Sequence, residues 1–224
     1  MKTAVITGAA GSLGTAVAKR FTSNGYKVIG IVNKISASSD FETVQADLTD
    51  EAQTEKAVTD ILEKYGQIDV LVATAGGFAM GDIKDTKSSD IMAQYKINFE
   101  TAYHIARPVF NHMKGRGSGR IFLTGSRAGI DTAAGAKSML AYSLSKSLLA
   151  RLAEVLNEEA KDLDVVTSLI VPSIIDTPPN RKAMPGADAS KWVTPEAIAE
   201  VIYFYGSEAA TSLREPIIKV YGKS

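Results

Sequence analysis

The chain has 224 residues, in which 25 lysine and arginine residues balance 25 aspartate and glutamate residues. This balance leaves no overall electrostatic field that would favour nucleic acid or an anionic membrane, so neither is expected as a partner. The chain contains no cysteine, which excludes disulfides, thiolate metal sites and a cysteine nucleophile, and we expect no metal site.

The apolar runs of the chain are short. The first, Ala4–Ile6, is too short for the apolar core of a signal peptide and leads directly into glycines. No stretch approaches the ~20 consecutive apolar residues of a membrane span. We therefore expect a cytoplasmic protein. Because the chain shows no repeat, low-complexity tract or linker, its length predicts a single domain over residues 1–224.

Short apolar segments alternate with longer segments of helical period along the whole chain. In chain order, the predicted elements are strand Thr3–Ile6, helix Thr15–Asn24, strands Lys27–Val32 and Val44–Ala46, helix Glu51–Tyr65, strand Ile68–Ala73, a helix over about Asp90–Lys114, strand Arg120–Thr124, helix Ala141–Asp162, strand Val165–Val171, helix Pro195–Tyr205 and strand Pro216–Val220. Most of these strands are apolar on both faces, which is typical of a parallel sheet with helices on both sides. The sequence therefore predicts an α/β protein with a Rossmann-type doubly wound parallel sheet.

A glycine-rich segment, Thr7–Gly14, lies between the first predicted strand and the first predicted helix. A glycine turn at this place brings backbone N–H groups close to a pyrophosphate, and the helix N-terminus adds partial positive charge. A tight turn of small residues would have the same composition, but the position after the first strand favours a dinucleotide site. The residues predicted to bind the dinucleotide are Gly8, Gly11, Ser12, Leu13 and Gly14.

Tyr142 and Lys146 are four residues apart near the start of a predicted helix, so both side chains share one helical face. A phenol has an ordinary pKa near ~10, and a neighbouring ammonium lowers that pKa toward the range that suits proton transfer at neutral pH. Such pairs occur on many exposed helices. The pair therefore gains its weight from the motifs around it.

Together these motifs resemble the short-chain dehydrogenase/reductase family. The family opens with Thr-Gly, three residues, Gly, one residue and Gly; here Thr7, Gly8 and Gly14 match, and Ser12 stands where the middle glycine is usual. The resemblance covers about residues 3–178. It implies an oxidoreductase that transfers hydride between NAD(P)H and a small carbonyl or alcohol substrate.

The resemblance also implies roles for individual side chains. Tyr142 would be the general acid in reduction, and Lys146 and Asn98 would complete a proton relay. Ser126, at the end of a strand, would orient the substrate oxygen, with Thr124 as the alternative donor. In the family, the residue that matches Asn98 distorts a helix and holds a water.

The same resemblance implies further contacts with the cofactor. Asp47 matches an aspartate that meets the adenine ring, although an aspartate that caps the following turn would look the same. The family's Asn-Asn-Ala-Gly after the fourth strand is replaced here by Ala73–Gly76, and its Pro-Gly after the sixth by Pro172-Ser173. The additional residues expected at the cofactor are Asp47, Leu48, Ala75, Gly76, Gly77, Pro172 and Thr177, together with Tyr142 and Lys146.

The end of the second predicted strand bears on the choice of dinucleotide. An acid there hydrogen-bonds the adenosine ribose and repels a 2′-phosphate, but Val32 occupies that place. Asn33, Lys34 and a serine within 36–39 are candidates to accept the phosphate, although the same residues would suit an ordinary polar loop. We therefore expect NADP in preference to NAD.

The segment at about 177–191 has several prolines and glycines and no strong period, so we expect a small substrate loop. Two stretches, Ala75–Phe78 and Asp176–Pro185 followed by Ala187-Asp188 and Trp192, resemble the dihydropteridine reductase branch of the family, which makes reduction of quinonoid dihydropterin an alternative function. That branch usually lacks the serine found here at Ser126 and selects NADH through an acid that this chain lacks. The candidates to line a substrate pocket are Phe78, Met139, Arg181 and Trp192, of which Phe78 and Trp192 would also suit simple packing.

A second alternative is a catalytically idle dinucleotide sensor. The intact Ser126, Tyr142 and Lys146 argue against it, because a sensor needs no proton donor. The predicted helices at about Asp90–Lys114 and Ala141–Asp162 have more apolar positions than one sheet face requires. Since the matching helices pair between subunits in the family, we expect a homodimer or a homotetramer.

Overall fold

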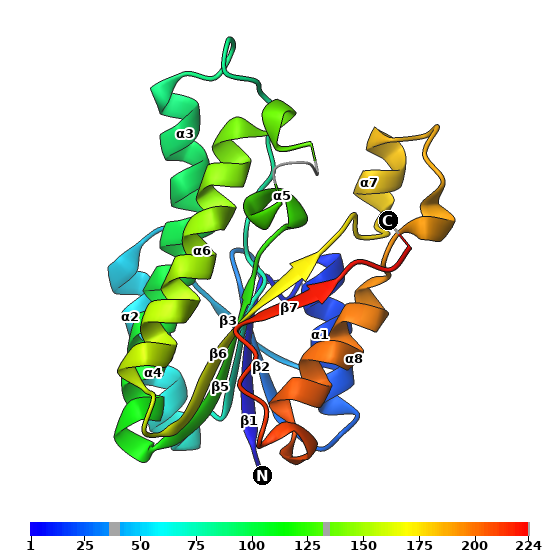
Figure 1. Cartoon of the computed structure of the whole chain (residues 1–224). Helices are drawn as coiled ribbons and strands as arrows, with labels where there is room; N and C mark the ends of the chain where they lie inside the picture. Colours follow the sequence, from blue (N-terminus) through cyan, green and yellow to red (C-terminus); the bar gives the residue numbers. More distant parts are fainter. Residues whose placement is uncertain (36–40, 132–134, 224) are drawn as a thin grey trace.

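The computed structural model describes residues 1–35, 41–131 and 135–223. Seven strands form one sheet in the order β3-β2-β1-β4-β5-β6-β7, and every neighbouring pair is parallel. Figure 1 shows this sheet between two layers of helices, and the buried side chains place α2, α4 and α6 on one face and α1 and α8 on the other. The predicted Rossmann-type α/β fold is confirmed.

The strands lie close to their predicted ranges. They are β1 (Thr3–Thr7), β2 (Lys27–Val32), β3 (Glu42–Gln45), β4 (Val70–Ala73), β5 (Ser118–Thr124), β6 (Asp164–Pro172) and β7 (Ile217–Val220). The α-helices are α1 (Ser12–Thr22), α2 (Glu51–Tyr65), α3 (Ser88–Tyr95), α4 (Thr101–Arg116), α5 (Arg127–Ile130), α6 (Leu140–Glu159), α7 (Pro178–Ala183) and α8 (Pro195–Gly206). Within the described ranges, no helix is both long and apolar enough to cross a membrane.

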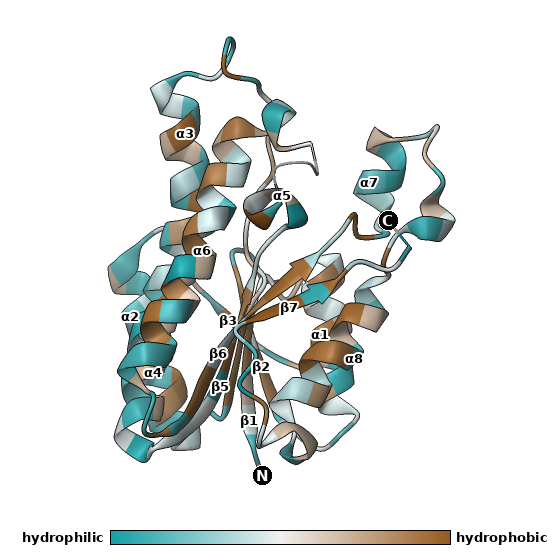
Figure 2. Cartoon of the chain, viewed as in Figure 1, coloured by the Kyte–Doolittle hydropathy of each residue, from teal (hydrophilic) through white to brown (hydrophobic). Residues whose placement is uncertain are grey.

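The sheet buries apolar side chains on both faces, because successive residues of a strand point to opposite sides. In β1, Val5 packs into the core beneath α2, α4 and α6, whereas Ala4 and Ile6 pack into the core beneath α1 and α8. Figure 2 shows hydrophobic residues along the strands and on α6 and α8. A fully buried side chain such as Phe21 stabilises the fold by roughly 1.5–3 kcal/mol. With both faces covered, ligands have access only at the edges of the sheet.

The ends of the helices follow the capping signals of the sequence. The Asp50 side chain accepts a hydrogen bond from the Gln53 N–H at the start of α2, and Gly66 ends that helix in the left-handed conformation with φ 77°. The Thr194 side chain likewise accepts from the Ala197 N–H at the start of α8. Both helices therefore begin where the sequence predicts, and α2 also ends there.

The structure differs from the sequence prediction at three places that bear on the carboxyl edge of the sheet. Helix α1 begins at Ser12 rather than Thr15, because the glycine turn is short and Gly11 is already the capping residue. The long helix predicted over Asp90–Lys114 is interrupted by one turn of π-helix at Lys96–Glu100. The segment at about 177–191 is not a loop throughout, since Thr177 caps α7, which begins with two prolines.

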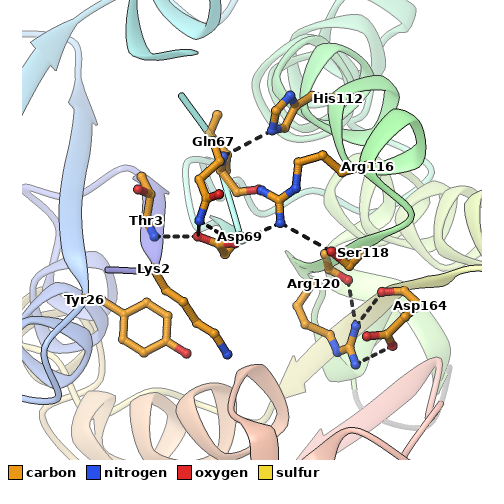
Figure 3. Close-up of polar contacts among 12 residues, drawn as sticks. Lys2, Thr3, Tyr26, Gln67, Asp69, His112, Arg116, Ser118, Arg120 and Asp164 are labelled. Atoms are coloured by element: carbon orange, nitrogen blue, oxygen red, sulfur yellow. Dashed lines mark hydrogen bonds and ion pairs between the residues drawn. The ribbon is translucent and has the colours of Figure 1, made fainter. Parts of the chain in front are cut away.

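A polar network closes the amino-terminal edge of the sheet, where it ties β1 and β4 to α4 (Figure 3). The Asp69 carboxylate accepts from the Thr3 N–H at 2.7 Å and pairs with Arg116 at 2.9 Å. The Ile68 N–H donates to Nε2 of His112 at 3.3 Å. Side chains thus seal this edge and leave the opposite, carboxyl edge for a ligand.

This network predicts a dependence of stability on pH. Burial, followed by the neighbouring Arg116 cation, lowers the pKa of His112 below its ordinary value, so the folded protein favours the neutral imidazole. As the pH falls through ~6.5, the unfolded chain takes up this proton first, and stability is lost as the pH falls further. We predict that the urea-derived free energy of unfolding falls more for the wild type than for His112→Gln between about pH 7.5 and about pH 5.5. Parallel curves would contradict this role of His112.

Candidate active site

The site lies at the carboxyl edge of the sheet, where the loops that follow the parallel strands meet. Strand β1 pairs with β2 on one side and with β4 on the other, so the direction of winding changes between β1 and β4. Open α/β sheets bind ligands at such a switch point. The predicted cofactor and catalytic residues come from the loops and helices that follow β1, β2, β3, β4, β5 and β6.

The glycine turn after β1 is too tight for side chains at two positions. Gly8 has φ +61°, and a Cβ there would lie 2.9 Å from the backbone nitrogen of Ala75. A Cβ on Gly14 would lie 2.3 Å from the Gly8 carbonyl oxygen. Gly11 caps α1 without a side-chain hydrogen bond, so the first N–H groups of the helix are available to an anion. This cradle fits a dinucleotide pyrophosphate, and the departure at Ser12 does not disturb it, because Ser12 is exposed.

Two threonines join the glycine turn to the loop after β4. The Thr74 hydroxyl donates to the Thr7 carbonyl at 2.7 Å, and the Thr7 hydroxyl accepts from the Ala75 N–H at 3.2 Å. Sequence analysis noted Thr74 only as a departure from the family pattern. Its hydroxyl joins the two loops that are predicted to contact the cofactor.

A cavity of about 450 Å³ lies beside this turn. Its lining residues are Gly8, Ala10, Gly11, Val32, Asn33, Lys34, Thr74, Ala75 and Gly76. The cavity thus joins the glycine turn to the end of β2 and to the loop after β4. Leu13 is buried, whereas Asn33 and Lys34 are exposed. The candidate serines within 36–39 lie outside the described residues.

Asp47 caps its own turn. Its Oδ1 accepts from the backbone N–H and from the hydroxyl of Thr49, at 2.9 Å and 2.8 Å, and these bonds lower the pKa of the carboxyl. Leu48 is buried, and its carbonyl lies 2.9 Å from Nδ1 of His104. The local capping interpretation therefore accounts for the Asp47 contacts that the structure shows.

Asp47 also borders a larger hollow of about 630 Å³ between α2 and α4. Arg107 forms ion pairs there with Glu51 and Glu55. None of the predicted catalytic residues is among those that the described structure places around this hollow. We therefore assign the chemistry to the smaller cavity and to the polar side chains beside it.

Helix α6 carries the predicted catalytic pair and faces the loop after β5. Lys146 is only 5% exposed, and its Nζ donates to the Thr124 carbonyl at 2.8 Å. This Nζ lies 5.9 Å from the centre of the Tyr142 ring. The Ser126 hydroxyl is hydrogen-bonded to the Tyr142 hydroxyl. In the part of the chain that the structure describes, the Thr124 hydroxyl is buried without a partner, so Ser126 and not Thr124 contacts the phenol.

Burial governs the protonation of both groups. It lowers the pKa of Lys146 to about 8 and raises the pKa of Tyr142 above its ordinary value, while the hydrogen bond from Ser126 opposes the second shift. We expected the ammonium to lower the pKa of the phenol. In the structure, desolvation of the phenol is the larger effect, and Tyr142 is protonated at neutral pH.

Asn98 lies at the centre of the π-helical turn that interrupts the long helix. Its side chain is completely buried. Asn98 is therefore not a surface residue, which was the alternative interpretation. The expected helix distortion is therefore present at this residue. π-Turns inside helices are frequent at functional sites.

The Asn98 amide connects three segments of the site. Its Oδ1 accepts from the Gly77 N–H at 3.0 Å, and its Nδ2 donates to the Gln94 Oε1 at 3.2 Å and to the Ser145 hydroxyl at 3.1 Å. Sequence analysis missed Gln94 and Ser145. Ser145 lies inside the motif that carries Tyr142 and Lys146, and Gln94 lies four residues before Asn98, a spacing that places both on one helical face.

The residues proposed to line a substrate pocket behave differently from one another. Phe78 is 58% exposed and packs edge-to-face on the Tyr142 ring at 5.0 Å, so it does not serve to fill the core. Trp192 is buried, which agrees with a packing role. The guanidinium of Arg181 is held by Asp176 in a two-point ion pair.

The remaining predicted residues lie at the same edge. Pro172 is buried at the end of β6, and Thr177 caps α7, the next helix along the chain. The backbone of Met139 pairs with that of Gly81, so the loop after β4 is joined to the start of α6. Figure 1 shows α7 beside the C-terminus, on the far side of the carboxyl edge from α3.

Comparison with known proteins agrees with this geometry. The family model described as short chain dehydrogenase matches residues 2–187. Versicolorin reductase stcU of Emericella nidulans is 25% identical over 99% of this chain and 94% of its own length. The 3-oxoacyl-[acyl-carrier-protein] reductase MabA of Mycobacterium tuberculosis is 25% identical over 99% of this chain and 92% of its own. The solved structure of ElxO with NADP bound has a TM-score of 0.90 at 24% identity and covers 99% of this chain and 97% of that one.

The steric limit at the glycine turn can be tested directly. We predict that Gly14→Ala weakens binding of NAD(P)H, followed by its fluorescence, by at least about tenfold, because the added Cβ must displace the Gly8 carbonyl. Gly115→Ala is the matched control, since a Cβ on Gly115 meets nothing within 4 Å. Equal affinity of the two variants would contradict the assignment of this turn.

Proposed function

The chain belongs to the short-chain dehydrogenase/reductase family and is an NAD(P)-dependent oxidoreductase; from that premise we propose that Tyr142, with Ser126, Lys146 and Asn98, reduces a small carbonyl substrate. The observation that carries this proposal is the hydrogen bond between Ser126 and a partly buried Tyr142 beside a buried ammonium. Ser126 can orient a substrate oxygen, and Tyr142 can protonate the same oxygen.

The side chains suit the direction of reduction. The bound dinucleotide supplies the hydride. Tyr142 is protonated at neutral pH, so its phenol can donate a proton to the carbonyl oxygen as negative charge develops there. The Ser126 hydroxyl orients that oxygen. Lys146, with a pKa of about 8, can release and regain a proton near neutral pH, as the return of a proton to Tyr142 requires.

We propose NADP as the preferred dinucleotide. Support comes from the end of β2, where apolar Val32 replaces an acid and the exposed Lys34 lines the cavity. A lysine beside the adenosine ribose favours a 2′-phosphate by charge. The structural neighbour ElxO was solved with NADP bound, which agrees with this preference.

The two alternatives have less support. Pterin reduction relied on the segment around Phe78 and on α7, whereas the relatives reported above are named for the reduction of other substrates. A sensor would not need the hydrogen-bonded phenol. We propose that the segment at about 177–191, which includes Arg181, forms a small substrate loop at one side of the site.

We also propose a cytoplasmic homodimer or homotetramer. Six large apolar side chains are exposed on the π-turn and on α3, α4 and α6: Met92, Ile97, Tyr103, Leu144, Leu148 and Val155. Such a face favours association with a second copy. A monomeric mass from light scattering would contradict this proposal.

The role of Tyr142 is tested by removal of its hydroxyl. We predict that Tyr142→Phe lowers kcat for NADPH-dependent reduction by about 10²–10⁴-fold, the usual contribution of a general acid. A panel of benzaldehyde, cyclohexanone and diacetyl would serve as substrate. Tyr203→Phe, on the opposite face of the sheet, should keep wild-type turnover. Full activity of Tyr142→Phe would sink the proposed mechanism.

The role of Lys34 is tested by comparison of the two dinucleotides. We expect Lys34→Ala to weaken NADPH binding by about tenfold or more and to leave NADH binding nearly unchanged, because only NADPH carries the 2′-phosphate. Lys19→Ala, at an exposed position late in α1, is the control for loss of a positive charge. If the wild type binds NADH more tightly than NADPH, the proposed preference is wrong.

A further inference from the structure

Three serines on α6 make the same local hydrogen bond. The hydroxyls of Ser143, Ser145 and Ser147 each donate to the carbonyl three residues earlier, at 3.0 Å, 2.8 Å and 2.8 Å. Ser145 differs from the other two because its oxygen also accepts from Nδ2 of Asn98. It is also the most deeply buried of the three, with 3% of its surface exposed.

The direction of these bonds is set by the backbone. A hydroxyl has one proton, and Ser145 uses that proton on the Tyr142 carbonyl, which can only accept. The Ser145 oxygen must therefore act as the acceptor toward Asn98. At the other end, the Gly77 N–H can only donate, so it requires the amide oxygen of Asn98. Both ends thus select the same orientation of the Asn98 amide.

This orientation matters for Lys146. A Cβ on Gly76 would lie 2.7 Å from Oδ1 of Asn98 and 3.3 Å from Nζ of Lys146, so the amide oxygen and the ammonium lie against the same residue. If the Asn98 amide were rotated by 180°, its NH₂ group would face both the Gly77 N–H and the Lys146 ammonium. Two donors would then face each other, and the cation would lose a favourable dipole.

Gln94 is a weaker determinant of this orientation. Its Oε1 accepts from Asn98, but its own amide can rotate and present Nε2 instead. A hydroxyl committed to a backbone carbonyl has no such freedom. Ser145 is therefore the side chain that fixes the orientation of the Asn98 amide, because its own hydroxyl is oriented by a backbone carbonyl.

We propose that Ser145 is a positioning residue for the reduction, which holds the amide oxygen of Asn98 toward Gly77 and Lys146. The inference rests on the proposed function, and it adds a residue that touches neither substrate nor cofactor. Ser145 acts only through Asn98, so its loss should have little consequence once the Asn98 amide is gone.

The test is a double-mutant cycle of Ser145→Ala and Asn98→Ala, with Ser147→Ala as the control that loses the same kind of local bond. Steady-state reduction by NADPH of the most rapidly reduced compound of the carbonyl panel would give kcat and KM, and NADPH fluorescence would give cofactor affinity. We expect Ser145→Ala to lower kcat by about tenfold, with KM and NADPH affinity within about twofold of wild type. The double variant should be no slower than Asn98→Ala alone. Ser147→Ala should match the wild type.

Urea midpoints of the same variants test the contact without any need for turnover. Non-additive shifts are expected for Ser145→Ala and Asn98→Ala, because the two side chains share one hydrogen bond. Additive shifts, or a kcat for Ser145→Ala equal to that of Ser147→Ala, would overturn the inference. If the wild type reduces nothing in the panel, the proposed function fails by itself, and the urea cycle then decides for or against the Ser145–Asn98 contact.

Discussion

The active edge of this protein depends on a buried lysine. The Lys146 ammonium is almost entirely removed from solvent and donates to the carbonyl at the end of β5. Removal of such a charge from water costs several kcal/mol unless hydrogen bonds compensate it. Helix α5 packs directly on α6 next to this lysine. A Cβ on Gly129 would lie 2.8 Å from the Cβ of Lys146, so only glycine allows the two helices to come this close. The cost of burying Lys146 thus falls where the proposed proton relay requires an exchangeable proton.

The two edges of the sheet differ in how they are closed. At the amino edge, Asp69 and Arg116 join strands to α4 with side-chain bonds. At the carboxyl edge, glycines keep Cβ atoms away from the turn after β1, and Thr74 holds the next loop at a defined separation. Rigid closure at one end thus allows an open, preorganised site at the other. Preorganised dipoles are the larger part of what a protein adds to hydride chemistry.

The fold, and which residues gather at the carboxyl edge of the sheet, could be predicted because their signals are local. Alternating strands and helices, the caps at Asp50 and Thr194, and the glycine turn each follow from neighbouring residues. The spacing of Tyr142 and Lys146 placed both on one face of α6. These predictions depend on a few residues at a time and on periodicity.

What the sequence could not predict depends on contacts across the fold. Ser145 meets Asn98 only because α6 packs beside the π-turn, and their separation along the chain carries no such signal. Gln94, by contrast, lies four residues before Asn98, so that contact is local. The raised pKa of Tyr142 arises from burial that a motif does not report. Asp47 could not be assigned for a different reason. An aspartate that contacts the cofactor and an aspartate that caps a turn have the same sequence pattern, so the pattern does not distinguish the two roles.

The central claim is that hydride moves from a nicotinamide to a carbonyl carbon at this edge of the sheet. The most direct measurement uses NADPH labelled with deuterium on the reactive face of the nicotinamide ring, with mass spectrometry of the alcohol formed from a carbonyl of the panel. The account predicts one deuterium on the carbinol carbon and a hydroxyl proton drawn from solvent. An alcohol that carries only solvent hydrogen on that carbon would contradict direct transfer and the account with it.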